Sequence, residues 1–195
     1  ALVGLPAAAQ AAPAPAPATV HDDGTVTVRI IAINDIHGRI GAMTVPWAGT
    51  VEQARAENPD SLLISSGDNQ GASLFASAIA DDVPIMDVLG AMDLDATAVG
   101  NHEFDKGQDD LVRIGEHLGL PELGANVYDE TGAPFLPEYS VLEIAGLKVG
   151  VIGTAPNDLA TLVSASAVEG LTIGDEIEAT NRVAAQIADE VDLVV

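Results

Sequence analysis

The feature that most constrains this fold is a pattern that occurs three times, in which a short apolar segment is followed directly by a polar cluster. Each segment is rich in Ala, Val, Ile or Leu and has the length of a buried strand. The three clusters are residues 34–39 (NDIHGR), 67–71 (GDNQG) and 100–105 (GNHEFD). Their members Asp35, Asp68 and Asn101 recur at equal intervals, close to the length of one strand–helix–strand unit. Because ligands of open α/β sheets bind at the carboxyl ends of the strands, the pattern predicts one site built from all three clusters.

The hydrophobic periodicity predicts an α/β domain with a mixed sheet. In the carboxyl-terminal helix, Ile177, Ala184, Ile187 and Val191 are expected to share the buried face. Strands are expected at residues 25–34, 61–66, 95–99 and 124–127, as a hairpin of 139–145 and 147–154 about Gly146, and from 192 to 195. Helices are expected at residues 47–57, 73–80, 84–92, 107–118 and 175–191.

Composition narrows the classes of function. The chain has 195 residues, which favours one domain, and 30 acidic against 7 basic residues give a formal charge of −23. Such a balance argues against binding to a nucleic-acid polymer or to anionic lipid, since both need Lys and Arg. With no cysteine, disulfides, thiolate metal sites and cysteine nucleophiles are excluded. Hydrophobic residues make up 48% of the chain, enough for a core, but no stretch has the length of a membrane span.

Residues 1–20 differ from the rest of the chain because they carry no charge. They open apolar, pass through Ala7, Ala8 and Ala9, and continue as an Ala/Pro alternation. The apolar opening predicts the remnant of a secretory signal peptide, and the alternation an extended linker. A plain linker is the alternative. The expected product is secreted, periplasmic or displayed at the cell surface, with a catalytic domain over residues 25–195.

The clusters carry ligands for hard or borderline divalent metals. In an extended segment Asp35 and His37 point to the same side, so both side chains can hold one ion. Asp68 can bridge two ions through its two oxygens, and Asn101 offers a neutral oxygen to the second. Without cysteine, the set suits Mn, Zn, Mg or Fe. Two such ions polarise a phosphoryl group and lower the pKa of a bound water, which gives hydroxide at neutral pH.

The third cluster also offers an acid–base pair. Asp105 can orient His102 by accepting a ring N–H, and an oriented imidazolium can stabilise phosphoryl charge or protonate a leaving alkoxide. Each cluster alone also has a structural explanation as a turn or cap, and only their combination favours a site. Glu103 is expected to cap or pack its loop, and His117 to lie at a helix end. For Arg39, the sequence does not distinguish a contact with a phosphate from an ion pair with an acidic residue.

These residues resemble the calcineurin-like metallophosphoesterases. The Asp-x-His, Gly-Asp and Gly-Asn-His-Glu set matches the signature of that superfamily. The longer GNHEFDxG motif at residues 100–107, with LGANV at 123–127 and LKVGVIG at 147–153, is similar to the secreted 5′-nucleotidase and UDP-sugar hydrolase branch. The similarity covers roughly residues 26–195.

The resemblance implies a four-layer αββα sandwich with mixed sheets, incomplete at the carboxyl terminus, and two divalent ions. It implies Asp35 and His37 as ligands of the first ion, Asp68 as the bridge and Asn101 on the second. His102 and Asp105 would form the catalytic dyad, and Asn101, His102 and Arg39 the substrate contacts. The implied activity is hydrolysis of the phosphoester of a small nucleotide.

The resemblance also leaves alternatives open. A 2′,3′-cyclic nucleotide phosphodiesterase or a UDP-sugar hydrolase would use the same core. An inert surface-binding protein with a degenerate phosphoesterase domain is the alternative of another class. The family's further histidine ligands and its base-stacking domain lie after the strand that resembles residues 192–195. These residues by themselves are therefore expected to bind metal weakly and to turn over slowly.

Overall fold

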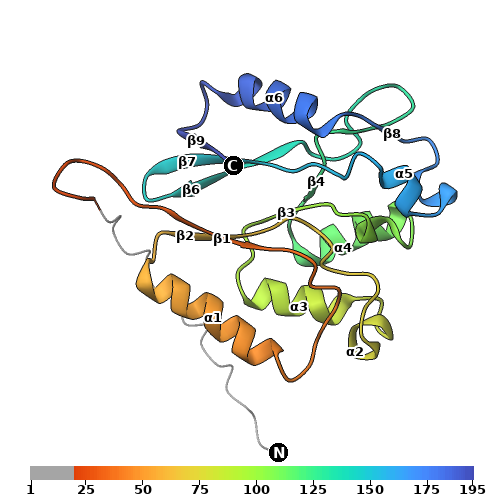
Figure 1. The fold of residues 1–195 in the computed structure, drawn as a ribbon, viewed down its shortest axis with the longest axis horizontal. Coiled ribbons are helices and arrows are strands. Elements are labelled where there is room, and N and C mark those ends of the chain that lie inside the picture. Colours follow the sequence, from red (N-terminus) through yellow and green to blue (C-terminus); the bar gives the residue numbers. More distant parts are fainter. Residues whose placement is uncertain (1–19) are drawn as a thin grey trace, which may run out of the picture.

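In the computed structural model, which describes residues 20–195, two sheets are stacked face to face and covered by helices on both outer sides (Figure 1). The expected signal remnant and linker lie outside the described residues, apart from Val20. The first sheet is parallel, in the order β1-β2-β3-β4. Its strands are β1 (Arg29–Ile33), β2 (Ser61–Ser65), β3 (Ala96–Ala98) and β4 (Glu122–Leu123).

The second sheet is mixed. An antiparallel hairpin of β6 (Tyr139–Ile144) and β7 (Leu147–Ile152) is extended by β9 (Leu193–Val194), which runs parallel to β7. Both turn residues of the hairpin, Ala145 and Gly146, have positive φ, as tight hairpin turns require. A separate antiparallel pair joins β5 (Val127–Tyr128) to β8 (Thr172–Ile173).

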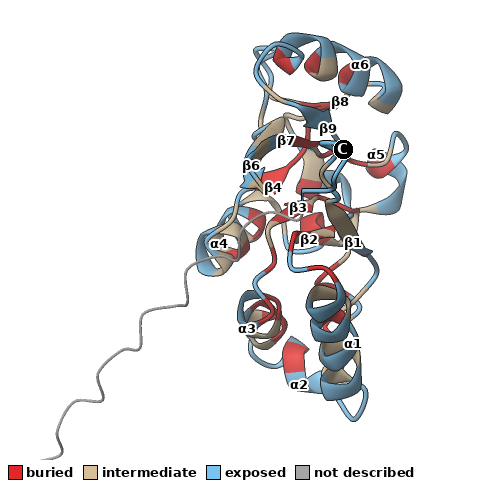
Figure 2. Ribbon diagram, turned by 90° about the vertical axis from the view of Figure 1, so that its left-hand side faces the viewer, coloured by how far each residue is buried: buried red, intermediate tan, exposed pale blue. Residues whose placement is uncertain are grey.

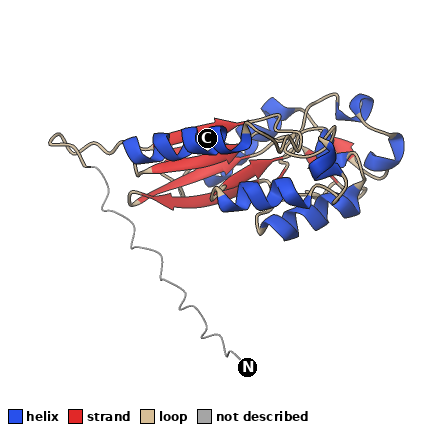
Figure 3. Cartoon of the chain, turned by 90° about the horizontal axis from the view of Figure 1, so that it is seen from below, coloured by secondary structure: helices blue, strands red, loops and turns tan. Residues whose placement is uncertain are grey.

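Helices form the two outer layers, and Figure 3 shows them on either side of the strands. Three of them pack on the parallel sheet, and α6 packs on the mixed one. The helices are α1 (Thr44–Glu57), α2 (Phe75–Ala78), α3 (Val83–Ala91), α4 (Gln108–Leu118), α5 (Leu159–Leu162) and α6 (Glu176–Ile187), with short 3₁₀ turns η1 (His102–Phe104) and η2 (Ala165–Val168). No helix within residues 20–195 is long and apolar enough to cross a bilayer.

The core follows the two-residue period of the strands. In β2, Leu63 faces the helices and packs with Ile85, Leu89 and Ile114 of α3 and α4. The neighbouring Leu62 faces the other way and packs with Val149 between the two sheets. Buried residues accordingly line the inward sides of every layer in Figure 2. The four-layer α/β sandwich expected from the sequence is confirmed, and it places the ends of β1, β2 and β3 side by side.

The expected strand at residues 124–127 is wrong, because β4 ends at Leu123 and β5 begins only at Val127. The Gly124 N–H donates to Pro137 O and the Ala125 N–H to Gly153 O, so this stretch crosses from the first sheet to the second. The apolar residues of LGANV are buried in this crossing segment. Hydrophobic periodicity does not distinguish such a segment from a buried strand.

Two helix predictions also need correction. The helix expected at 73–80 is reduced to the single turn α2, because Leu74 is extended and Asp81 and Asp82 both have left-handed φ. The last helix ends at Ile187, and its buried face is formed by Ala179, Val183 and Ile187. Ile177, expected on that face, is 65% exposed. It lies in the first turn, where the Asp175 side chain caps the helix by accepting the N–H groups of residues 177 and 178.

Candidate metal centre

The first two polar clusters are held together by their backbones. The His37 N–H donates to Asp68 O at 2.9 Å, and the Gly38 N–H donates to Asn69 O at 2.9 Å. A third bond joins the Asp35 N–H to Gly67 O at 3.2 Å. The loops after β1 and β2 thus continue the parallel pairing of their strands beyond the sheet. As a result, the side chains of both clusters face a common space.

Asp35, His37 and Asp68 each offer a ligand atom, and these three atoms lie within 4.8 Å of one another. The His37 Nδ1–H donates to Gly71 O at 3.2 Å, because a carbonyl only accepts. Nε2, the other ring nitrogen, lies 3.4 Å from Asp35 Oδ1 and faces the cluster. An imidazole oriented through its other nitrogen, beside two carboxylates, is the donor set that divalent metals take in proteins.

The backbone at all three of these residues is left-handed. The φ angles are 54° at Asp35, 49° at His37 and 53° at Asp68, although none is glycine. Asp and His tolerate this region better than most residues, but each still costs about 1–3 kcal/mol. Strain of this kind collects at functional sites, where it aims side chains that relaxed strands would point elsewhere.

The third cluster joins the first two through Asp68. Asp68 Oδ1 accepts the His102 N–H at 2.9 Å, and a side chain on Gly100 would collide with that carboxylate. Asn101 therefore lies between two residues that touch Asp68. Its own side chain makes no hydrogen bond within residues 20–195, which leaves its amide oxygen open to a ligand. The structure thus brings Asp35, His37 and Asp68 together and sets Asn101 at their edge.

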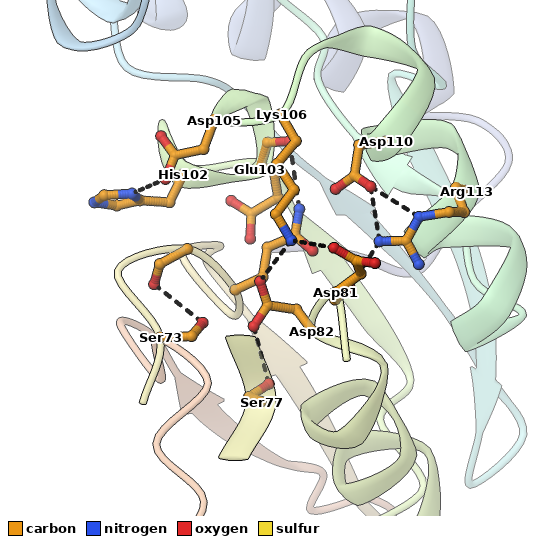
Figure 4. A network of polar contacts seen from close by, with 12 residues as sticks. Ser73, Ser77, Asp81, Asp82, His102, Glu103, Asp105, Lys106, Asp110 and Arg113 are labelled. Carbon is orange, nitrogen blue, oxygen red and sulfur yellow. Dashed lines mark hydrogen bonds and ion pairs between the residues drawn. The ribbon is translucent and has the colours of Figure 1, made fainter. Parts of the chain in front are cut away.

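His102 and Asp105 form a hydrogen-bonded pair at the mouth of this space (Figure 4). The His102 Nδ1–H donates to Asp105 Oδ2 at 2.7 Å, and the His102 ring lies edge-on to the His37 ring at 4.9 Å between centroids. Burial alone lowers the pKa of His102. The hydrogen bond and charge of Asp105, with the acids behind it, outweigh burial and raise that pKa above its ordinary value.

A small cavity of about 150 Å³ adjoins the pair, with Lys106 and Asp82 on its far side. Lys106 Nζ lies 3.4 Å from both Asp81 and Asp82, so two acids already offset its charge (Figure 4). A larger cavity of about 460 Å³ lies between α4 and residues 135–137, and no residue of the three clusters lines it. The chemistry of the polar clusters, rather than cavity size, therefore locates the site.

The remaining residues singled out in the sequence do not belong to the group formed by Asp35, His37 and Asp68. Arg39 is exposed and makes no side-chain hydrogen bond or ion pair within the described chain, so neither of its two expected roles is favoured. His117 pairs with Asp87 at 2.9 Å at the end of α4, as expected for a helix-end histidine. Glu103 is fully buried and packs its loop, also as expected.

Gly71 belongs to the second polar cluster, and the structure gives it a role that the sequence pattern did not indicate. Its carbonyl orients His37, and a Cβ added to it would lie 2.6 Å from His102 Cβ and 2.7 Å from Asp105 Oδ2. Its φ of +73° also favours glycine. The only indication in the sequence was the glycine itself, which stands three residues after Asp68 in the cluster that follows β2.

Gly71→Ala is expected to displace the His102–Asp105 pair and to lower any turnover that depends on this pair at least about tenfold, since an Å-scale misplacement costs about 100-fold. Gly119→Ala is the matched control, because Gly119 has nearly the same φ (+76°) but open space around its Cα. Both variants should lose about 1–2 kcal/mol of stability from left-handed strain. Rates and thermal unfolding of the two variants test this, and equal rates in both would contradict the steric role of Gly71.

Comparisons with known proteins agree with this geometry. No family model matches the chain. The chain is 30% identical over 192 residues to "Endonuclease YhcR" of Bacillus subtilis, covering 83% of this chain and 16% of that protein. It is 29% identical over 185 residues to a 5′-nucleotidase of Vibrio cholerae, and the match covers 89% of this chain and 34% of that protein. The crystal structure of the calcineurin-like phosphoesterase YfkN from Bacillus subtilis superposes with a TM-score of 0.75 at 27% identity, over 86% of this chain and 60% of that one.

A two-sheet α/β sandwich of this topology is the fold of a calcineurin-like phosphoesterase. The chain belongs to the calcineurin-like metallophosphoesterase superfamily, on its 5′-nucleotidase branch. It spans about a third or less of the length of the first curated relatives that it matches.

Proposed function

We propose that this chain carries the catalytic core of a metal-dependent phosphoester hydrolase that acts on small nucleotides, in the manner of a 5′-nucleotidase. The observation that carries the proposal is the Asp35, His37 and Asp68 cluster with an oriented imidazole beside it. Similarity to proteins named 5′-nucleotidase supports the substrate class.

In this proposal, Asp35 and His37 would hold the first of two divalent ions and Asn101 the second, and Asp68 would contribute to both. When bound, such ions supply polarisation of the phosphoryl group and a water with a lowered pKa. They also reverse the local sign of the field, which lets a chain of charge −23 accept an anionic nucleotide.

His102 and Asp105 supply the protein's own part of the chemistry. Asp105 fixes the ring through Nδ1–H, so Nε2 faces the open side of the pair. When protonated, the imidazolium would stabilise the phosphoryl oxygens in the transition state with its positive charge. It also holds a proton that the leaving alkoxide can take. Asn101 and Arg39 are the further substrate contacts proposed, with Arg39 exposed at the end of the first cluster.

Export to the periplasm or the cell surface is part of the proposal and depends on the apolar opening of residues 1–20. A second candidate activity is nuclease action, which the similarity to a protein named endonuclease favours. The charge of −23 favours a small nucleotide over a polymer.

A substrate panel tests the proposed function. AMP, UDP-glucose, 2′,3′-cyclic AMP and a single-stranded oligonucleotide are each incubated with Mn²⁺, Zn²⁺ or Mg²⁺, and product release is measured with and without EDTA. We expect metal-dependent phosphate release from AMP, lost with EDTA and restored by excess metal. Preference for another arm would reassign the substrate. Because these residues by themselves are expected to turn over slowly, the inert binding protein would be favoured by absence of turnover on every arm in a longer chain that carries the family's further histidine ligands and binds Mn²⁺.

A further inference from the structure

Glu103 lies in the GNHEFD cluster but has no place in the chemistry proposed above. Its side chain is fully buried, with 0% exposure. No Lys, Arg or His within residues 20–195 forms an ion pair with it. The carboxylate is instead held by three backbone N–H donors, from Asp68 at 2.9 Å, Asn69 at 2.9 Å and Gly100 at 2.7 Å. A buried carboxylate satisfied by backbone alone fixes the shape of that backbone.

The donors belong to two different loops. Asp68 and Asn69 follow β2, while Gly100 follows β3, so one carboxylate joins both loops. The two loops also pack backbone against backbone, since a Cβ on Gly67 would lie 2.2 Å from Gly100 N. The join is reciprocal, because the Asp68 carboxylate accepts the His102 N–H in return. Each loop therefore contributes a carboxylate that holds the other loop's backbone.

This arrangement bears directly on the candidate metal ligand and on the dyad. The backbone of Asp68 is in the left-handed region, which is strained for a residue other than glycine. Contacts with neighbouring residues must therefore hold this conformation. The Glu103 contact to the Asp68 N–H restrains that residue's backbone, and the side chain of Asp68 then meets the His102 N–H. Without Glu103, the N–H groups of Asp68, Asn69 and Gly100 would lose the carboxylate that joins the two loops.

We propose that Glu103 is a positioning residue, which sets Asp68 for metal binding and His102 for catalysis by clamping the loops after β2 and β3. It touches neither metal nor substrate, and it acts only through the backbone of its neighbours. The part of the inference that concerns catalysis by His102 rests on the proposed function. The part that concerns the clamp between the two loops applies to the metal-free protein.

Glu103→Gln is the informative change, because the amide keeps the volume but replaces one acceptor oxygen by a donor. That donor would face a backbone N–H, so at least one of the three bonds is lost. Glu122→Gln is the matched control. Glu122 is also buried, at 3% exposure, but its carboxylate makes no hydrogen bond to either loop. Burial and the neighbouring Glu103 raise its pKa, so Glu122→Gln removes an acid beside Glu103 and breaks none of the bonds of the clamp.

Amide hydrogen exchange of the metal-free protein, followed by NMR, measures the clamp. In Glu103→Gln, we expect the amides of Asp68, Asn69 and Gly100 to exchange at least about tenfold faster than in the wild type, as the loss of a buried charge-assisted bond implies. Mn²⁺ affinity should fall about 10–100-fold, the range for residues that orient metal ligands. Glu122→Gln should leave both readouts unchanged. If circular dichroism shows that Glu103→Gln is unfolded, Glu103→Asp, which keeps the charge but shortens the reach, should show the same faster exchange.

Unchanged exchange in both Glu103 variants, or equal acceleration of the same amides in Glu122→Gln, would overturn the clamp. Neither readout requires turnover. A wild type that hydrolyses no nucleotide, with exchange still specific to Glu103, would therefore count against the proposed function and not against the clamp.

Discussion

Asp68→Asn is expected to lower Mn²⁺ affinity by at least about 100-fold, because even residues that only orient metal ligands give 10–100-fold effects. Nucleotide hydrolysis should fall with it. Asp68 touches both other clusters, through its carbonyl to His37 and its carboxylate to His102. The amide keeps one acceptor oxygen for the His102 N–H, and Asn tolerates the left-handed backbone. The loss should therefore be one of charge and ligation, with thermal unfolding of the metal-free protein little changed.

Asp93→Asn is the matched control for this change. Asp93 is exposed, follows α3, and has a φ of 51° against 53° at Asp68. The same substitution in the same backbone conformation, away from the clusters, should leave affinity and hydrolysis as they are. Isothermal titration with Mn²⁺ compares the three proteins. Equal affinity in wild type and Asp68→Asn would remove Asp68 from the metal site.

His102→Ala is expected to lower kcat about 10²–10⁴-fold, the usual contribution of a positioned acid–base group. Metal affinity should stay close to that of the wild type, because the His102 contact to Asp68 is made by the backbone N–H. This separation of effects distinguishes the two residues, since Asp68→Asn lowers both quantities. Phosphate release from AMP at saturating Mn²⁺ is the measurement.

His117→Ala supplies the control for His102. His117 also pairs with an acid, Asp87 of α3, at 2.9 Å, but it lies in the last turn of α4, whereas the third cluster precedes the first turn. Its loss should leave kcat unchanged. If hydrolysis by His102→Ala equals that of His117→Ala, the assignment of His102 and Asp105 as the dyad is wrong.

The part of this site that sequence could predict is the part set by short-range order. Apolar runs ending in Asp35, Asp68 and Asn101 indicated buried strands, and parallel strands necessarily align their carboxyl ends. That alone brought the clusters together. The spacing of His102 and Asp105 likewise fits one turn of η1, so their contact is local.

What sequence could not predict depends on packing between distant segments. Glu103 was expected to pack its own loop, but its partners Asp68 and Asn69 lie more than thirty residues away. The space that Gly71 leaves for His102 exists only once both loops are in place. The segment 124–127 has the apolar composition of a strand. Only its hydrogen bonds to residues 137 and 153 show that it crosses between the sheets.

Anomalous diffraction from crystals of this protein grown with Mn²⁺ is the most direct test that these clusters form a metal centre. The predicted result is an anomalous peak bonded to Asp35, to His37 Nε2 and to Asp68, absent from crystals of Asp68→Asn grown in the same way. The contradicting result is a map with no peak between those residues, or with Mn²⁺ only on surface carboxylates elsewhere.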